Sequence, residues 1–454
     1  MTANRARPSA PHPLSRRAAM ALPFALPLSL AGCGAGSGWF GKIKQPLPGV
    51  REPVLTARRT LAVGAAPPTV TLPPSVANAD WPQPGGNPAH DMGQLAARSA
   101  LARSWETGVG AGGGYRMQLL ATPVVASGVV YTMDARARVR AFDLATGAPR
   151  WHAETRGKHV RSTNVGGGLG IADGVLYAAN GLGDLVALDA AHGTQRWRAS
   201  LGAPARSGPT IVAGRAFLTT IDDQVLALDT AHGQALWSYQ ATNATTALLG
   251  TPAPAYADGL VVAGFASGEI AALRAESGSV VWTDTLYAPA IGGTLPDIAS
   301  IRGLPAIAGG RVVAIGMGGL AVGIDLPSGR RLWSHAVAGE DNPWVAGDWA
   351  FLITLDQIIT AIRIDDGTVA WATQLPRWKN AKHHTNPLTW FGPLLAAGRL
   401  VVTGTSGDAL AISPYTGAIL GHQKLPGPAA PVQPILASGT LLLLSNDGRL
   451  IALR

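Results

Sequence analysis

The only cysteine of this chain, Cys33, is the residue with the clearest chemistry. It follows Leu30-Ala31-Gly32, and before these residues come arginines at positions 5, 7, 16 and 17 and an apolar stretch from Ala18 to Ala31. A basic segment, a short apolar segment and small residues in this order are typical of an export signal. The apolar stretch is too short to span a bilayer. We therefore expect residues 1–32 to be a lipoprotein signal peptide and Cys33 to carry the lipid.

Acylation of Cys33 would leave no cysteine for a disulfide, and several acyl chains would anchor the chain stably to a membrane. The next residues, up to position 79, are rich in Gly, Pro and Ala. Residues 33–79 are therefore expected to form a lipidated N-terminus and an extended tether. The pair Arg16-Arg17 leaves both Sec and twin-arginine export open, with Sec favoured because Ala19 and Met20 replace the larger apolar residues of a twin-arginine signal.

Other residues that could do chemistry are isolated in the sequence. His383 and His384 have no cysteine or carboxylate close by, which favours a solvated loop over a metal site. Asp222-Asp223 and Asp365-Asp366 lie where turns are expected, and Gly166 to Gly170 does not complete a dinucleotide-binding motif. We therefore predict no catalytic residue, no metal and no cofactor.

The overall charge also excludes one class of partner. The formal net charge of +9 falls to +5 when the signal is removed, because residues 1–32 contain four arginines and no acid. This excess is small for a chain of this length and does not indicate nucleic-acid binding.

A repeated pattern organises most of the chain. Each copy is an apolar alternating run, as in Val139 to Trp151 (VRAFDLATGAPRW), followed by a turn with a glycine and, four residues later, a tryptophan. Copies lie 38 to 51 residues apart, the period of a four-stranded propeller blade. The tryptophans of the copies are Trp151, Trp197, Trp237, Trp282, Trp333 and Trp371.

The last copies of the pattern predict how the ring closes. A seventh copy has Gly421 in place of tryptophan, and Ala452 to Arg454 begin an eighth that the chain end cuts short. Trp105 supplies the missing tryptophan from the other end of the chain. We therefore predict an all-β fold over residues 80–454, an eight-bladed β-propeller of four-stranded blades, with an N-terminal strand that closes the last blade.

The repeat resembles that of propellers that bind pyrroloquinoline quinone. In that family a disulfide between neighbouring cysteines, calcium ligands and a catalytic Asp hold and use the quinone. The single cysteine and the shorter length of this chain argue against that cofactor.

The combination of lipoprotein signal, tether and propeller resembles the BamB family of the outer-membrane β-barrel assembly machinery. Segments Trp81 to Asn87, Leu388 to Pro393 and Pro48 to Leu55 are similar to its alphaproteobacterial branch. The resemblance implies a non-enzymatic scaffold on the periplasmic face of the outer membrane that binds a POTRA domain of the barrel-forming subunit, beside other assembly lipoproteins. Gly34 is consistent with outer-membrane sorting, since it lacks the Asp of an inner-membrane retention signal.

Two inter-blade loops carry the docking in that family. They correspond here to Thr246 to Pro254, with Leu248 and Leu249, and to Pro296 to Arg302, with Asp297 and Arg302. The family's arginine has become Leu249, and two of its acids have become Ser300 and Arg302, so the contact chemistry must differ. Leu248 and Leu249 fit either an exposed apolar anchor or ordinary blade packing.

Two other functions remain open from the sequence. A periplasmic quinoprotein-type dehydrogenase would need a polar funnel with convergent acids and amides. A propeller that binds carbohydrate or peptidoglycan would need exposed aromatic residues on one face. The tryptophans outside the repeat are the only candidates for this role: Trp344, Trp349, Trp378 and Trp390.

Overall fold

The computed structural model describes residues 61–114, 117–158, 160, 162–244, 250, 252–288 and 298–454. Within these ranges the regular secondary structure consists of β-strands, and no helix there is long and apolar enough to cross a membrane. The predicted signal peptide, Cys33 and most of the expected tether lie outside the described residues, so these assignments stay predictions.

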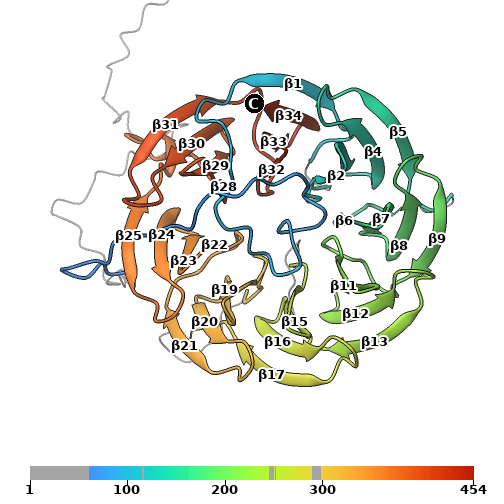
Figure 1. Ribbon diagram of the computed structural model, residues 1–454, viewed down its shortest axis with the longest axis horizontal. Coiled ribbons are helices and arrows are strands. Elements are labelled where there is room, and N and C mark those ends of the chain that lie inside the picture. The colour runs from blue at the N-terminus through green and yellow to red at the C-terminus, as the bar shows by residue number, and fades with distance from the viewer. Residues whose placement is uncertain are drawn as a thin grey trace, which may run out of the picture. The chain divides into compact units, whose positions relative to one another are not determined.

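Eight antiparallel four-stranded sheets form a ring, as predicted (Figure 1). Blade 1 consists of β2 (Val124–Ala126), β3 (Val129–Met133), β4 (Arg138–Asp143) and β5 (Pro149–Glu154), and blade 2 of β6 (Gly167–Ala172), β7 (Val175–Asn180), β8 (Asp184–Asp189) and β9 (Gln195–Ser200). Blade 3 consists of β10 (Thr210–Val212), β11 (Arg215–Thr219), β12 (Gln224–Asp229) and β13 (Ala235–Gln240). Blade 4 consists of β14 (Ala255–Ala257), β15 (Leu260–Gly264), β16 (Glu269–Arg274) and β17 (Val280–Thr285).

Blades 5 to 8 continue the ring. Blade 5 consists of β18 (Ala306–Ala308), β19 (Arg311–Ile315), β20 (Ala321–Asp325) and β21 (Arg331–His335), and blade 6 of β22 (Trp344–Ala346), β23 (Trp349–Ile353), β24 (Ile358–Arg363) and β25 (Val369–Gln374). Blade 7 consists of β28 (Trp390–Ala396), β29 (Arg399–Gly404), β30 (Asp408–Ile412) and β31 (Ile419–Lys424). Blade 8 consists of β32 (Ile435–Ala437), β33 (Thr440–Ser445), β34 (Arg449–Leu453) and β1 (Arg103–Gly108). A separate hairpin, β26 (Trp378–Asn380) with β27 (Thr385–Pro387), lies between blades 6 and 7.

The ring closes through blade 8, which combines the two ends of the propeller. Strand β1 pairs antiparallel with β34, so that Trp105 lies opposite Ala452 and Glu106 opposite Ile451. Glu106 also accepts a 2.5 Å hydrogen bond from Arg449. The predicted N-terminal closing strand is therefore confirmed.

The repeated tryptophans join neighbouring blades. Each of the seven indole N–H groups donates to a backbone carbonyl oxygen of the next blade, at 2.7 to 3.2 Å. Each ring also lies against the turn glycine of that next blade: a Cβ atom added at Gly147, Gly193, Gly233, Gly278, Gly329, Gly367 or Gly417 would lie less than 3.0 Å from the ring. The glycine and the tryptophan of one copy therefore contact different neighbours.

This relationship explains why the seventh copy has no tryptophan. Gly421 pairs with Ala411, as Trp371 pairs with Ala361 one blade earlier. The blade that follows is blade 8, whose last two strands, β34 and β1, come from opposite ends of the propeller. Blade 8 therefore has no turn between its third and fourth strands, and so no glycine there on which an eighth tryptophan could rest.

A central segment, residues 78–97, runs around the inside of the ring (blue in Figure 1). It exchanges hydrogen bonds with the innermost strand of every blade or the turn next to it. The partners, in order along the segment, are Ser438, Val125, Ile171, Ile211, Tyr256, Ile307, Trp344 and Leu395. This segment ties the eight blades together at their inner edges, and the sequence had indicated only that it belongs to the propeller.

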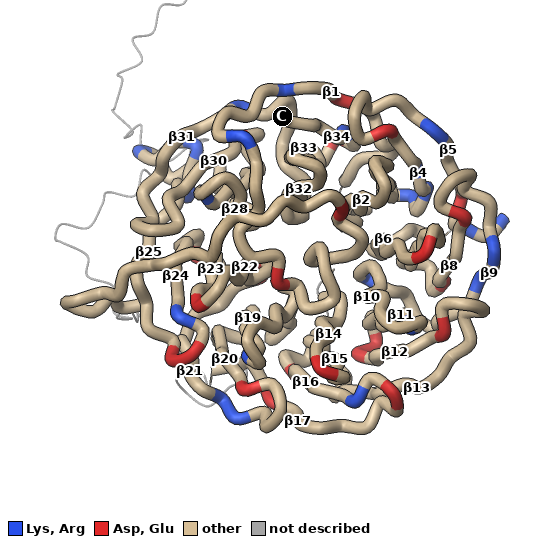
Figure 2. The backbone as a smooth tube through the Cα atoms, in the orientation of Figure 1, with Lys and Arg blue, Asp and Glu red and all other residues tan. Residues whose placement is uncertain are grey.

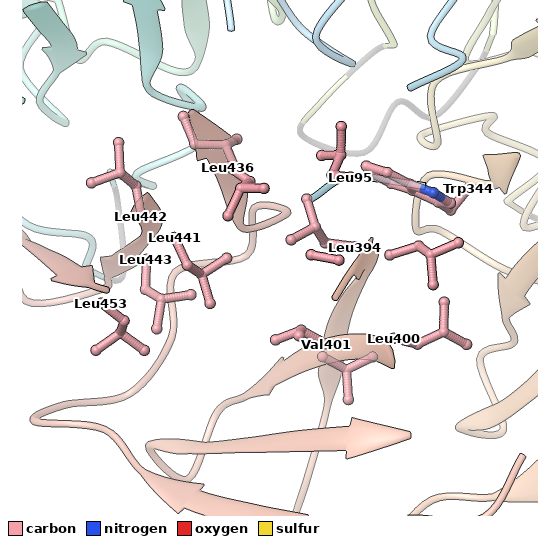
Figure 3. Close-up of a cluster of buried hydrophobic side chains, with 14 of the residues drawn as sticks. Leu95, Trp344, Leu394, Leu400, Val401, Leu436, Leu441, Leu442, Leu443 and Leu453 are labelled. Carbon is pink, nitrogen blue, oxygen red and sulfur yellow. The ribbon is translucent and has the colours of Figure 1, made fainter. Parts of the chain in front are cut away.

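The largest hydrophobic core joins the central segment to blades 6, 7 and 8. Leu95 and Trp344 lie beside Leu394, and the leucines of β33 and β34 fill the space toward blade 8 (Figure 3). Burying a large apolar side chain stabilises the fold by roughly 1.5–3 kcal/mol. Val70, which lies within the expected tether, is also buried in this core.

Candidate functional site

The two ends of the ring differ in what they present. Each blade is an antiparallel meander, so the turns after its first and third strands lie at one end, which we call the hairpin face. The turn after its second strand and the link to the next blade lie at the other end, the connector face. The central segment bonds to Ser127, Ala397 and Ser438, which lie in turns of the hairpin face. The central segment therefore crosses the middle of the ring at the hairpin face and not at the connector face.

The described residues of both predicted docking loops, 250 and 252–254 in one and 298–302 in the other, lie in links between blades on the connector face. Of the four residues proposed for partner binding, Leu248, Leu249 and Asp297 lie outside the described residues. Arg302 is described and lies in the link between β17 and β18. A Cβ atom added at Gly250 would lie 3.5 Å from Nε of Arg302, so the ends of the two loops are neighbours.

Arg302 is neutralised within the chain. Its guanidinium donates to the carboxylate of Glu340, from the link between blades 5 and 6, and the two side chains are 20% and 21% exposed. The resemblance suggested that acids of this loop had been exchanged for other residues. The structure shows that Glu340, on the next link, supplies a negative charge beside the exchanged position, a partner that sequence spacing did not reveal.

A second acid, Asp341, lies beside this ion pair. Desolvation, together with the negative charge of Glu340, raises the pKa of Asp341 well above its usual range. Asp341 is therefore a weaker acid than an ordinary aspartate, beside the charge pair of Arg302 and Glu340.

Amide side chains connect the links around the middle of the ring. Asn342 accepts a 2.8 Å hydrogen bond from the backbone N–H of Leu304 and donates at 3.1 Å to Gln433, which in turn donates at 2.5 Å to the carbonyl of Pro393. These bonds join blades 5, 6, 8 and 7. Such a network holds the connector links in fixed positions.

The base of the first loop is also held by a side chain. Asp223 is buried, and its carboxylate accepts hydrogen bonds from the backbone N–H groups of Ala244 at 2.9 Å and Ala266 at 2.7 Å. Burial raises the pKa of Asp223. Its role is structural, as the turn position had predicted.

Two adjoining cavities occupy the middle of the connector side. The inner one, of about 110 Å³, is lined by β6, by six of the links between blades and by Pro84 of the central segment. The outer one, of about 390 Å³, shares Arg302, Glu340 and Asp341 with it. Figure 2 shows that most charged residues lie over the blades rather than in the middle of the ring.

Among the described residues, no group of three or more His, Cys, Asp or Glu side chains is placed to hold a metal ion. His383 and His384 are exposed at the turn between β26 and β27, as expected of a solvated loop. Asp366 bonds to Arg363 in its own turn, and that bond lowers its pKa below the usual range.

The four tryptophans proposed for carbohydrate binding, all among the described residues, do not form an exposed platform. Trp344, Trp349 and Trp390 are buried, with 2% to 4% of their surface exposed, and only Trp378 of this group is partly exposed. Trp344 stacks on Trp81 and donates to the carbonyl of Gly93, so it anchors the central segment. The structure therefore gives the carbohydrate-binding alternative no support.

Fold and site together define an eight-bladed propeller of quinoprotein-like repeats whose connector face carries paired charges. The chain is similar to a solved structure of BamB from Moraxella catarrhalis, with a TM-score of 0.65, 20% identity, and coverage of 78% of this chain and 100% of that one. It is also similar to quinohemoprotein alcohol dehydrogenase from Comamonas testosteroni, with a TM-score of 0.64, 13% identity, and coverage of 84% and 81%. At these identities the two likenesses show the fold.

The sequence comparison is more specific. The sequence model of the family described as outer membrane protein assembly factor BamB matches residues 135–373, more than half of the chain. The chain belongs to this family. A curated relative of that name from Burkholderia pseudomallei is 28% identical, over 77% of this chain and 87% of the relative.

Proposed function

We propose that this chain is a lipid-anchored, non-catalytic subunit of the machinery that assembles outer-membrane β-barrel proteins. The observation that carries the proposal is the family match over residues 135–373. Relatives from Burkholderia pseudomallei and Yersinia pestis bear the name outer membrane protein assembly factor BamB.

The connector face is the surface that binds the partner in this proposal. Hydrogen bonds of Asn342 and Asp223 hold the described parts of its links, and residues that are held before docking lose less conformational freedom on binding. Arg302 and Glu340 supply a charge pair at the rim, and Leu248 and Leu249 supply the apolar anchor. The partner is a POTRA domain of the barrel-forming subunit.

The lipid on Cys33 holds the propeller on the periplasmic face of the outer membrane, together with the other assembly lipoproteins. Anchoring partners to the same membrane raises their effective concentration, so moderate affinity between the propeller and the POTRA domain suffices. The function is to orient the barrel-forming subunit for the insertion of its clients.

The test is the affinity of the chain beginning at residue 33 for the purified POTRA domains of the same organism, measured by biolayer interferometry. Leu248→Asp, Leu249→Asp and Arg302→Glu are each expected to weaken binding at least tenfold. The control is Leu236→Asp, which changes an exposed leucine on the outer strand β13 and should leave binding within twofold. Equal binding by all four variants would remove the connector loops from the interface, and no binding by the wild type would overturn the docking proposal.

A further inference from the structure

The seam between blades 7 and 8 lacks the side chain that fills the other seven seams. Gly421 occupies the strand position that holds a tryptophan in the other repeats, since it lies opposite Ala411 in the sheet. A Cβ atom added at Gly421 would have no neighbour within 4 Å. The space that an indole fills elsewhere is therefore open here.

A mainly apolar cavity of about 190 Å³, whose lining also includes Arg399, His422 and Gln423, lies in this seam. Its walls include Gly421, Ala411 and Val401 of blade 7 and Leu441, Leu443 and Leu453 of blade 8. Figure 3 shows the three leucines on the blade 8 side and Val401 across from them on β29. An apolar cavity of roughly 150 Å³ suffices for benzene, so this one has room for an aromatic ring.

The strand beside the cavity is an exposed edge. β31 is the last strand of its sheet, and all six of its residues are exposed. Ile419 and Leu420 are 45% and 59% exposed, although apolar residues of this size are usually covered. Lys424, the kind of residue that protects an edge from pairing, is held at 2.7 Å by Asp408.

The molecule itself shows how an aromatic residue covers a glycine on a neighbouring strand. In blade 5, Gly323 of β20 lies opposite Trp333 of β21, and a Cβ atom added at Gly323 would collide with the indole ring. This arrangement, in which an aromatic ring on the adjacent strand rescues a glycine, stabilises sheets. A strand added beside β31 could cover Gly421 in the same way.

We propose that this seam binds an extended segment of an outer-membrane β-barrel client, which pairs with the edge of β31 and places an aromatic side chain over Gly421. The identity of the client class rests on the proposed function. The chemistry fits it, because strands of outer-membrane barrels alternate apolar and polar residues and carry aromatic residues near both membrane interfaces. The main chain would supply affinity, and the cavity would select the aromatic residue.

The experiment uses a fluorescein-labelled 12-residue peptide of alternating polar and apolar residues with one central Trp, and measures its binding to the chain beginning at residue 33 by fluorescence anisotropy. We expect the peptide with Ala in place of Trp to bind at least tenfold more weakly. Gly421→Trp should fill the cavity from within and weaken binding of the Trp peptide at least tenfold. Gly421→Ala, the matched control, should change it less than twofold.

A second measurement does not depend on the folding of a variant. A peptide with a photoreactive benzoylphenylalanine in place of Trp should cross-link the wild type within β31, β33 or β34. Cross-links confined to other blades, or equal binding of the Trp and Ala peptides, would overturn the proposal.

Further results would assign the seam to a different occupant and also overturn the proposal. One is that the Gly421→Trp variant no longer binds the barrel-forming subunit but still binds the peptide. Another is self-association of the wild type that Gly421→Trp abolishes, without peptide binding. If the wild type binds the POTRA domains but not the peptide, this inference fails and the proposed function stands. If it binds the peptide at the seam but not the POTRA domains, only the docking proposal fails.

Discussion

Trp151 of blade 1 lies against Gly193 of blade 2, and its Nε1 donates a 3.0 Å hydrogen bond to the carbonyl oxygen of Ala190 in the same turn. Gly193 has a φ of 73°, and a Cβ atom there would lie 2.5 Å from the Trp151 ring. The glycine is therefore required for two reasons, the conformation of the turn and the space for the neighbour's indole. The repeated motif encodes the contact between blades as well as the hairpin.

This contact predicts different costs for two similar substitutions. Gly174 has a φ of 71° but no atom within 4 Å of its would-be Cβ. Gly174→Ala should therefore lower the free energy of unfolding by only roughly 1–2 kcal/mol, the cost of a left-handed conformation for a residue with a Cβ atom. Gly193→Ala should cost about 1–3 kcal/mol more, because the indole must move. Urea unfolding of both variants measures the difference, and equal costs would show that Trp151 does not constrain this turn.

Ring closure predicts a large effect at Trp105. Its indole donates to the carbonyl of Leu144 in blade 1 and lies against Gly147. Trp105→Ala should lower the free energy of unfolding by about 3–5 kcal/mol, as for other large aromatic residues removed from a packed contact. Trp378→Ala, in the outlying β26–β27 hairpin, is the control and should cost less than about 1 kcal/mol. A small effect at Trp105 would mean that β1 is not needed to close the ring.

The buried histidine of the central segment predicts a pH dependence. Nδ1 of His90 donates to the carbonyl of Pro305 at 2.7 Å, and burial lowers the pKa of His90 from 6.5 to about 4. Between these values the unfolded chain binds more protons than the folded one. The stability from a neutral His90 is therefore complete above pH 6.5 and is lost as the pH falls toward 4.

The difference between the two pKa values corresponds to about 3 kcal/mol of unfolding free energy. In urea unfolding at pH 7, 6, 5 and 4.5, His90→Gln should lose less stability over this range than the wild type. Parallel pH profiles of the two proteins would show that His90 is not kept neutral by the fold.

Because Arg302 and Glu340 form a charge pair, exchanging the two residues should restore stability that is lost when only Arg302 is changed. Arg302→Glu would place a third acid beside Glu340 and Asp341, and we expect it to lower the free energy of unfolding by roughly 1–3 kcal/mol. The exchanged double variant, Arg302→Glu with Glu340→Arg, should recover at least half of that loss. Additive losses in the double variant would contradict a direct pairing of the two side chains.

The sequence predicts the periodic parts of this molecule well, because each blade repeats the same local signals. The turn glycines, the tryptophans and the closing strand with Trp105 all follow from the spacing of the copies. The sequence does not predict the central segment as a separate element, because this segment forms no strand ladder. Its only local signals are Trp81 and the pair Gly85-Gly86, whose positive φ values allow close contact with the side chains of His90 and Met92.

The candidate site could be predicted only in part. The sequence places Arg302 on a link between blades, but its pairing with Glu340 joins residues 38 apart on different links. No periodicity encodes such a contact. The seam cavity has a signal in the sequence, the glycine at position 421, but its meaning depends on the missing turn of blade 8, which only the closed ring reveals.

If this chain works as a subunit of the barrel-assembly machinery, it must be bound to the barrel-forming subunit in the membrane. The most direct measurement is to capture the tagged full-length chain from detergent-solubilised membranes of its own organism and to quantify the barrel-forming subunit by mass spectrometry. We expect that subunit to co-purify in amounts comparable to the chain itself, and its amount to fall strongly with Arg302→Glu. Capture of the intact, membrane-bound chain without the barrel-forming subunit would contradict this role.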